Sequence, residues 1–64
     1  MSKNTARRIT ALEREIAVAE EALAKLEDEL ADPAAWASPT GSERAAKRHS
    51  EARQRISDLY EELL

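Results

Sequence analysis

The sequence predicts an all-α fold, a two-helix antiparallel coiled-coil hairpin with a short helical turn at the tip. Three observations predict it: the composition, two separate heptad patterns of apolar residues, and an interruption that contains two prolines. The 64 residues are 36% charged and 3% aromatic, which is typical of a long helix or coiled coil. This length suits one small domain, residues 1–64, and is too short for a deep globular core.

The first heptad pattern predicts one long helix over about residues 5–31. Its apolar positions step alternately by three and four residues, as the a and d positions of a coiled coil do. These positions are Ile9, Leu12, Ile16, Ala19, Leu23, Leu26 and Leu30. The helix therefore has one apolar face that needs a partner.

The interruption, residues 32–40, is predicted to be a structured tip. Asp32 before Pro33 predicts an N-cap followed by proline at the first helical position, and so a short helical turn. Trp36 is expected to fold over Leu30 and the first turn of the second helix as a hydrophobic plug. Stacking of Trp36 on a nucleic-acid base is the alternative.

A capping box predicts that the second helix begins at about Gly41 and runs to residue 64. Thr40 is followed three residues later by Glu43, so each side chain would bond a backbone N–H at the helix start. The apolar positions of this helix again step by three and four residues: Ala45, His49, Ala52, Ile56, Leu59 and Leu63.

The two heptad patterns are out of phase, and this predicts that the chain folds back. Continuing the first pattern would place Arg44 and Lys47 at apolar positions, and the prolines also exclude one continuous helix. An antiparallel register with Ile16 opposite Leu59 places the six heptad positions of the second helix opposite six of the seven in the first. The charged pairs that flank this register are Glu29 with Arg48 and Glu20 with Arg53, which attract, and Glu15 with Glu62, which repel. Because the apolar face is small, we expect marginal stability or weak self-association through the open end.

No catalytic residue, cofactor site or metal site is predicted. The chain has no cysteine and only Gly41 as glycine, which excludes a thiolate site and a glycine-rich phosphate loop. His49 is the only histidine, so packing is the expected role rather than metal binding. No apolar run reaches the roughly 18 residues of a membrane span, so no membrane partner is predicted. A cytoplasmic location is expected.

The basic residues form two clusters, although the net charge is −3. Arg44, Lys47, Arg48 and Arg55 lie on the second helix, and Lys3, Arg7 and Arg8 lie near the start of the first. Both clusters are candidate phosphate contacts for DNA or RNA, and ordinary solvated helix surface explains them equally well. Since aromatic residues are not interleaved with them, binding would be directed to the backbone and sensitive to salt.

Two segments carry a more specific pattern, "ITALEREIAVAEEALAKLEDELADPAAW" and "ISDLYEELL". They resemble the C-terminal coiled-coil domain of ABC-F proteins, which are soluble ATPases with duplicated ATP-binding cassettes. The chain departs from the family pattern in its short Ser/Thr/Gly tip and in ending at Leu64, before the usual Trp-containing close. The tip motif is matched by Leu30, Asp32, Pro33 and Trp36, with Trp36 where tyrosine is more usual, and the closing segment by Leu59, Tyr60 and Leu63.

The resemblance implies a non-catalytic accessory domain that follows two ATP-binding domains, its partners within the parent ATPase. Family members act at the ribosome or in nucleic-acid transactions, so a contribution to DNA, ribosomal RNA or ribosome binding is expected. The chain is then expected to be an excised domain. Two alternatives remain: a structural coiled-coil module for interaction or oligomerisation, and the tRNA-binding helical arm of a valyl-tRNA synthetase. The tip of that arm usually carries a phenylalanine and an Ala-Pro element, unlike "LADPAAW".

Overall fold

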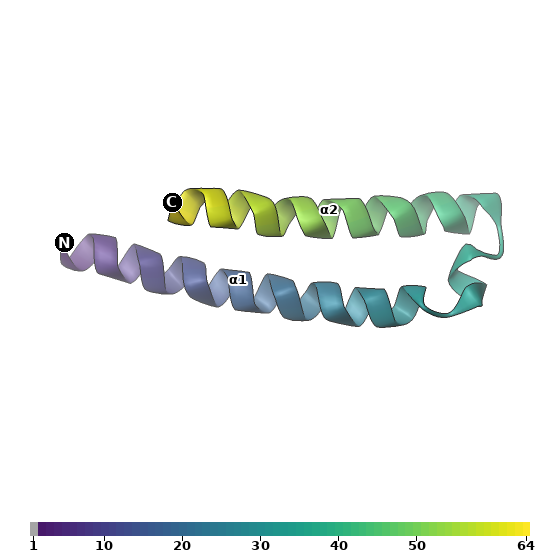
Figure 1. The fold of residues 1–64 in the computed structure, drawn as a ribbon, viewed down its shortest axis with the longest axis horizontal. Helices are drawn as coiled ribbons and strands as arrows, with labels where there is room; N and C mark the ends of the chain where they lie inside the picture. The colour runs from purple at the N-terminus through teal and green to yellow at the C-terminus, as the bar shows by residue number, and fades with distance from the viewer. Residues whose placement is uncertain (1) are drawn as a thin grey trace.

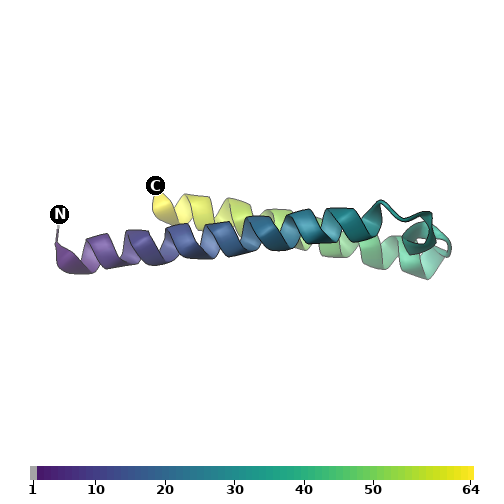
Figure 2. The same ribbon diagram turned by 90° about the horizontal axis from the view of Figure 1, so that it is seen from below.

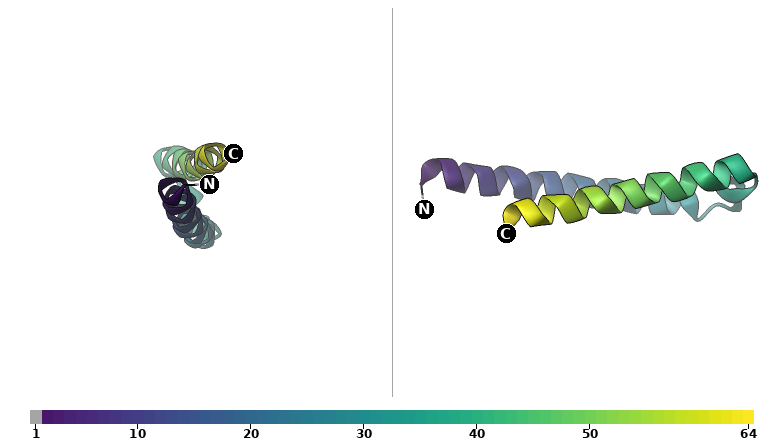
Figure 3. Two further views of the ribbon diagram at one scale, coloured as in Figure 1. Left: turned by 90° about the vertical axis from the view of Figure 1, so that its left-hand side faces the viewer. Right: turned by 90° about the horizontal axis from the view of Figure 1, so that it is seen from above.

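The computed structural model describes residues 2–64 as two long helices joined by a short helical turn (Figure 1). The helix α1 spans Lys3–Leu30, the 3-10 helix η1 spans Pro33–Trp36 and the helix α2 spans Pro39–Leu63. α1 and α2 lie side by side in antiparallel directions and cross at a shallow angle (Figures 2 and 3). The predicted all-α hairpin is confirmed.

The helix α1 is longer at its start than the heptad pattern predicts. Ser2 caps it, since the Ser2 hydroxyl accepts a hydrogen bond from the backbone N–H of Thr5 at 3.2 Å. The helix ends at Leu30 because Asp32 precedes a proline, which disfavours helical backbone angles, and Asp32 is extended. α1 extends beyond the end of α2, so the N-terminal turns form an overhang (Figure 1).

An apolar seam between α1 and α2 holds the hairpin together. All of the predicted a and d positions are buried or half-buried. The central cluster is formed by Leu12, Ile16 and Leu59, with Ala19 and Leu63 packed against it. These contacts agree with the predicted register, in which Ile16 lies opposite Leu59.

The tip forms as a short helical turn, as predicted from Asp32 and Pro33. The Asp32 side chain accepts a hydrogen bond from the backbone N–H of Ala34 at 3.0 Å, and Pro33 occupies the first helical position. The indole Nε1 of Trp36 donates to the carbonyl oxygen of Leu30 at 2.6 Å, and so satisfies a carbonyl at the end of α1. Trp36 is 44% exposed, so its ring covers part of the tip without sealing it.

The predicted start of α2 is wrong by two residues, and the predicted capping box is absent. Ser38 is the N-cap: its hydroxyl accepts from the backbone N–H of Gly41 at 2.9 Å, and Pro39 is the first helical residue. Ser38 adopts an extended conformation that suits both an N-cap and a residue before proline. Thr40 therefore lies inside the first turn of α2.

The cap assignment makes a testable prediction about two neighbouring hydroxyls. Replacing Ser38 by alanine leaves the N–H of Gly41 without its partner, which we expect to lower the free energy of unfolding by about 1 kcal/mol. Thr40→Ala is the matched control and should change it by less than about 0.5 kcal/mol. Urea denaturation followed by far-UV circular dichroism measures both values. A larger loss for Thr40→Ala than for Ser38→Ala contradicts the assignment.

The seam makes a second prediction. Leu59 is 3% exposed, whereas Val18 on α1 is 67% exposed. Leu59→Ala leaves a cavity in the central cluster and should lower the free energy of unfolding by about 2–5 kcal/mol. Val18→Ala should change it by less than about 0.5 kcal/mol. Thermal denaturation of the two variants gives the comparison, and equal losses contradict the placement of the seam.

Candidate nucleic-acid interface

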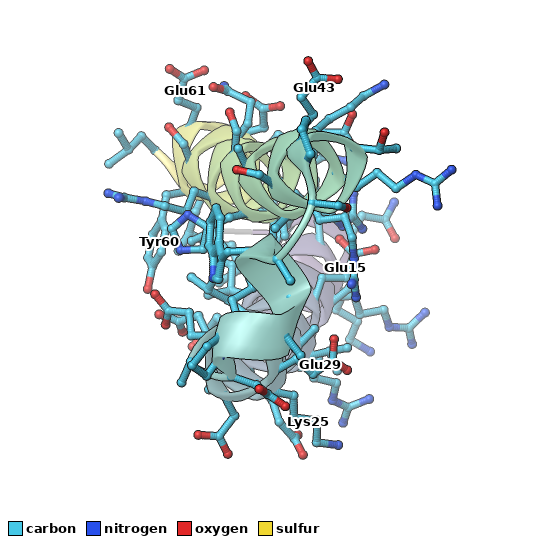
Figure 4. All side chains as sticks on the ribbon, turned by 90° about the vertical axis from the view of Figure 1, so that its right-hand side faces the viewer. Glu15, Lys25, Glu29, Glu43, Tyr60 and Glu61 are labelled. Atoms are coloured by element: carbon cyan, nitrogen blue, oxygen red, sulfur yellow. The ribbon has the colours of Figure 1, made fainter. Side chains whose placement is uncertain are left out.

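Four of the five arginine and lysine residues of α2 lie on one flank of the helix, whereas Arg53 lines a groove on the other flank. Arg44, Lys47, Arg48 and Arg55 are spaced by three, four and eleven residues from Arg44, which keeps them on one helical face. All four side chains are exposed. We call these four residues the basic flank. It lies on the same side of the hairpin as Glu29, which Figure 4 shows opposite to Tyr60.

Two carboxylates form ion pairs with residues of the basic flank and leave its other two positive charges unpaired among residues 2–64. Arg48 Nη2 lies 3.0 Å from Glu29 Oε2 on α1, as the predicted register requires. Lys47 Nζ lies 4.0 Å from Glu51 Oε1 within α2. Within residues 2–64, Arg44 and Arg55 form no ion pair. Exposed pairs of this kind contribute only about 0–1 kcal/mol, so a phosphate can displace the carboxylates at small cost.

The second predicted cluster lies at the other end of the molecule, which is 51 Å long. Lys3, Arg7 and Arg8 are exposed on the overhang of α1. Arg8 turns back to α2, where its Nη2 lies 3.5 Å from Glu62 Oε1. The structure therefore does not join the two basic clusters into one surface.

Arg14 lies next to the overhang, in the part of α1 that packs against α2, and it was missing from the sequence prediction. Arg7 and Arg14 line one shallow hollow on α1, together with the small residues Ala6, Thr10 and Ala11. Lys3, Arg7 and Arg14 are spaced by four and seven residues, which places them on one helical face. This spacing can be read from the sequence, but Arg14 lies among acidic residues and was therefore not assigned to a basic cluster.

In the other two predicted charged contacts, Glu20 and Glu62 meet different partners, because their side chains are long. Glu20, expected beside Arg53, instead accepts a hydrogen bond from the Tyr60 hydroxyl at 3.4 Å. Glu62, expected to repel Glu15, pairs with Arg8. His49 Nε2 lies 3.1 Å from Glu27 Oε2 and its ring is half-buried at the seam. Two of these side chains thus meet partners seven residues, or about two helical turns, away from the predicted ones.

Among the described residues 2–64, no group of three or more His, Cys, Asp or Glu side chains is placed to hold a metal ion. No helix in this part of the chain is both long and apolar enough to cross a membrane. The predicted tip residues Leu30, Asp32, Pro33 and Trp36 are brought together by η1. They form a structural bend with one exposed aromatic ring.

The chain is an antiparallel helical hairpin with a capped Asp-Pro tip. A family model described as the ABC transporter C-terminal domain matches residues 1–64, the whole chain. The chain therefore belongs to this family, and it is an accessory domain of an ABC protein. This result confirms the family resemblance and favours it over the synthetase arm. Comparisons with curated proteins and with solved structures found no match.

The pair between Glu29 and Arg48 makes a prediction that bears on the basic flank. Both side chains are more than half exposed, so a double-mutant cycle with Glu29→Ala and Arg48→Ala should give a coupling energy of about 0.2–1 kcal/mol. The coupling should decrease as salt is added. A coupling well above this range, or one that salt leaves unchanged, would mean that Arg48 is committed to Glu29 and is not free to bind phosphate.

Proposed function

We propose that this domain contributes nucleic-acid binding to its parent ABC protein, through phosphate contacts by the basic flank. The observation that carries the proposal is the geometry of Arg44, Lys47, Arg48 and Arg55, four exposed cations on one face of α2. The target is DNA or ribosomal RNA, free or within the ribosome, in the cytoplasm. The ATPase domains of the parent protein supply the catalysis.

The length of the basic flank supports this proposal. Arg44 and Arg55 are eleven residues apart, which corresponds to about 16 Å along a helix. At about 3.4 Å per base-pair step, this length matches about five steps of one strand. Arginine side chains suit such contacts because their planar guanidinium groups bind phosphate oxygens with two parallel hydrogen bonds.

The surroundings of the basic flank predict binding with little sequence preference. Tyr60 lies on the opposite side of the hairpin (Figure 4), and Trp36 lines a groove together with Glu27, away from the basic flank. Neither aromatic ring is placed to stack on bases that the arginine side chains approach. Contacts to phosphate position a protein on nucleic acid without reading its sequence.

The proposal is tested by titrating the 64-residue domain into fluorescently labelled duplex DNA and a structured RNA, with anisotropy as the readout. Four phosphate contacts at a salt slope of about −0.9 each predict that affinity for duplex DNA falls on the order of 100-fold between about 50 and 200 mM salt. Absence of binding to both nucleic acids at about 50 mM salt contradicts the proposal.

Two matched variants locate the contact. Changing Arg44, Lys47, Arg48 and Arg55 to glutamine should abolish most binding and reduce the salt slope toward zero. Changing Lys3, Arg7 and Arg8 to glutamine removes charge from the overhang and should have a smaller effect. Far-UV circular dichroism checks that both variants keep their helices. If binding survives the first set, the contact lies on the overhang or at Trp36, and the assignment to the basic flank is wrong.

A further inference from the structure

A groove of about 850 Å³ runs along the hairpin on the flank opposite to the basic flank. Both helices and the tip contribute to it, with Glu27 and Leu30 from α1, Trp36 from η1, and Ala46, His49 and Arg53 from α2. Its volume lies within the range of ordinary binding pockets. The groove is not part of the proposed phosphate contact.

Two partly exposed aromatic side chains, those of Trp36 and Tyr60, lie on this flank. The sequence contains one tryptophan, one tyrosine and no phenylalanine. Trp36 and Tyr60 are 44% and 45% exposed. Trp36 lines the groove beside Glu27, and Tyr60 bonds Glu20, which precedes Glu27 by seven residues on the same face of α1. Leu64, four residues after Tyr60, is fully exposed, so the apolar side chains continue toward the open end.

Small residues between these large side chains allow another helix to approach closely. The small residues that line the groove are Ala31, which caps the end of α1, and Ala46, Ser50 and Ser57 from α2. Small side chains at a contact permit the shorter interaxial distances between packed helices. On α1 the same face carries alanine at seven-residue spacing, beyond the groove itself. The small residues on this flank are Ala17 and Ala24 from α1, Ala31 at its C-cap, and Ala46, Ser50 and Ser57 from α2.

The charges on this flank identify the kind of partner. Glu13, Glu20 and Glu27 recur every seven residues on α1 and are all exposed. Glu27 lies beside His49, and Arg53 is the only arginine or lysine among the described residues that line the groove. A row of carboxylates repels nucleic-acid phosphates. It would also oppose the same row on a second copy of this chain packed α1 against α1 in the antiparallel direction. A partner that carries lysine or arginine side chains can form ion pairs with these carboxylates.

We propose that this flank docks a helix of a partner protein, and that the helix presents an apolar contact face with a lysine or arginine at every seventh residue. The apolar face of the partner helix packs on Trp36 and Tyr60, and the small residues allow that helix to lie in the groove between α1 and α2. The cations pair with Glu13, Glu20 and Glu27, which span about 21 Å of α1. A helix of about three heptads is long enough to meet all three carboxylates.

The test uses a synthetic peptide of about 21 residues with leucine and alanine on one helical face and lysine at every seventh position. The control peptide has glutamate in place of those lysines, and both peptides lack tryptophan. Because Trp36 is the only tryptophan, its fluorescence reports on the groove directly. The lysine peptide should produce a saturable change with at least 10-fold higher affinity than the glutamate peptide. Absence of a saturable change, or equal affinity for both peptides, overturns the proposal.

A matched pair of variants separates docking from general charge attraction. Changing Glu13, Glu20 and Glu27 to glutamine should remove the preference for the lysine peptide. Changing Glu15, Glu21 and Glu29 to glutamine alters the net charge equally on other faces of α1 and should retain it. Equal loss in both variants overturns the proposal, because only non-specific attraction would remain.

Two further measurements distinguish other occupants of the groove. Sedimentation across a concentration series should show that the lysine peptide binds a monomer. A dimer that the peptide dissociates would assign the groove to a second copy of the chain and overturn the proposal. Quenching of Trp36 by single-stranded nucleic acid, with saturation at a lower concentration than the lysine peptide, would overturn it as well. None of these results depends on binding by the basic flank, so the two proposals fail independently.

Discussion

The apolar seam between α1 and α2 is the interaction on which the rest of the structure depends. Leu12, Ile16 and Leu59 form its central cluster, and Ala45 is buried near the tip. The seam requires the chain to reverse, because the two heptad patterns cannot continue in one helix. Its register then determines which charged side chains meet across the hairpin, as the pair of Glu29 with Arg48 illustrates.

The seam also divides the remaining surface into two flanks with different chemistry. One flank carries Arg44, Lys47, Arg48 and Arg55, all exposed. The other carries a row of glutamates, two partly exposed aromatic rings and a groove lined in part by small residues. A thin hairpin has little interior, so function must be placed on these surfaces. We propose different partners for the two flanks, and both proposals are compatible with an accessory domain of an ABC protein.

Several features could be predicted from the sequence because they depend on local spacing or local backbone chemistry. The alternation of three and four residues identified every position of the seam, and Asp32 before Pro33 identified the turn at the tip. The pair of Glu29 with Arg48 followed from the register. The cap of α2 was placed wrongly, since Ser38 before Pro39 and Thr40 before Glu43 both resemble helix starts. Only Ser38 caps α2, because after η1 it is Ser38 that adopts the extended backbone of an N-cap.

The sequence by itself determined the two helices, the reversal between them and the residues that face the seam, because periodicity and proline act along the chain. The tertiary structure decided which other charged and polar side chains meet across the hairpin. Glu20 meets Tyr60 and Glu62 meets Arg8 because long side chains reach across the seam to neighbouring turns. Trp36 is held at the mouth of a groove by the carbonyl of Leu30. That position depends on how η1 packs against both α1 and α2.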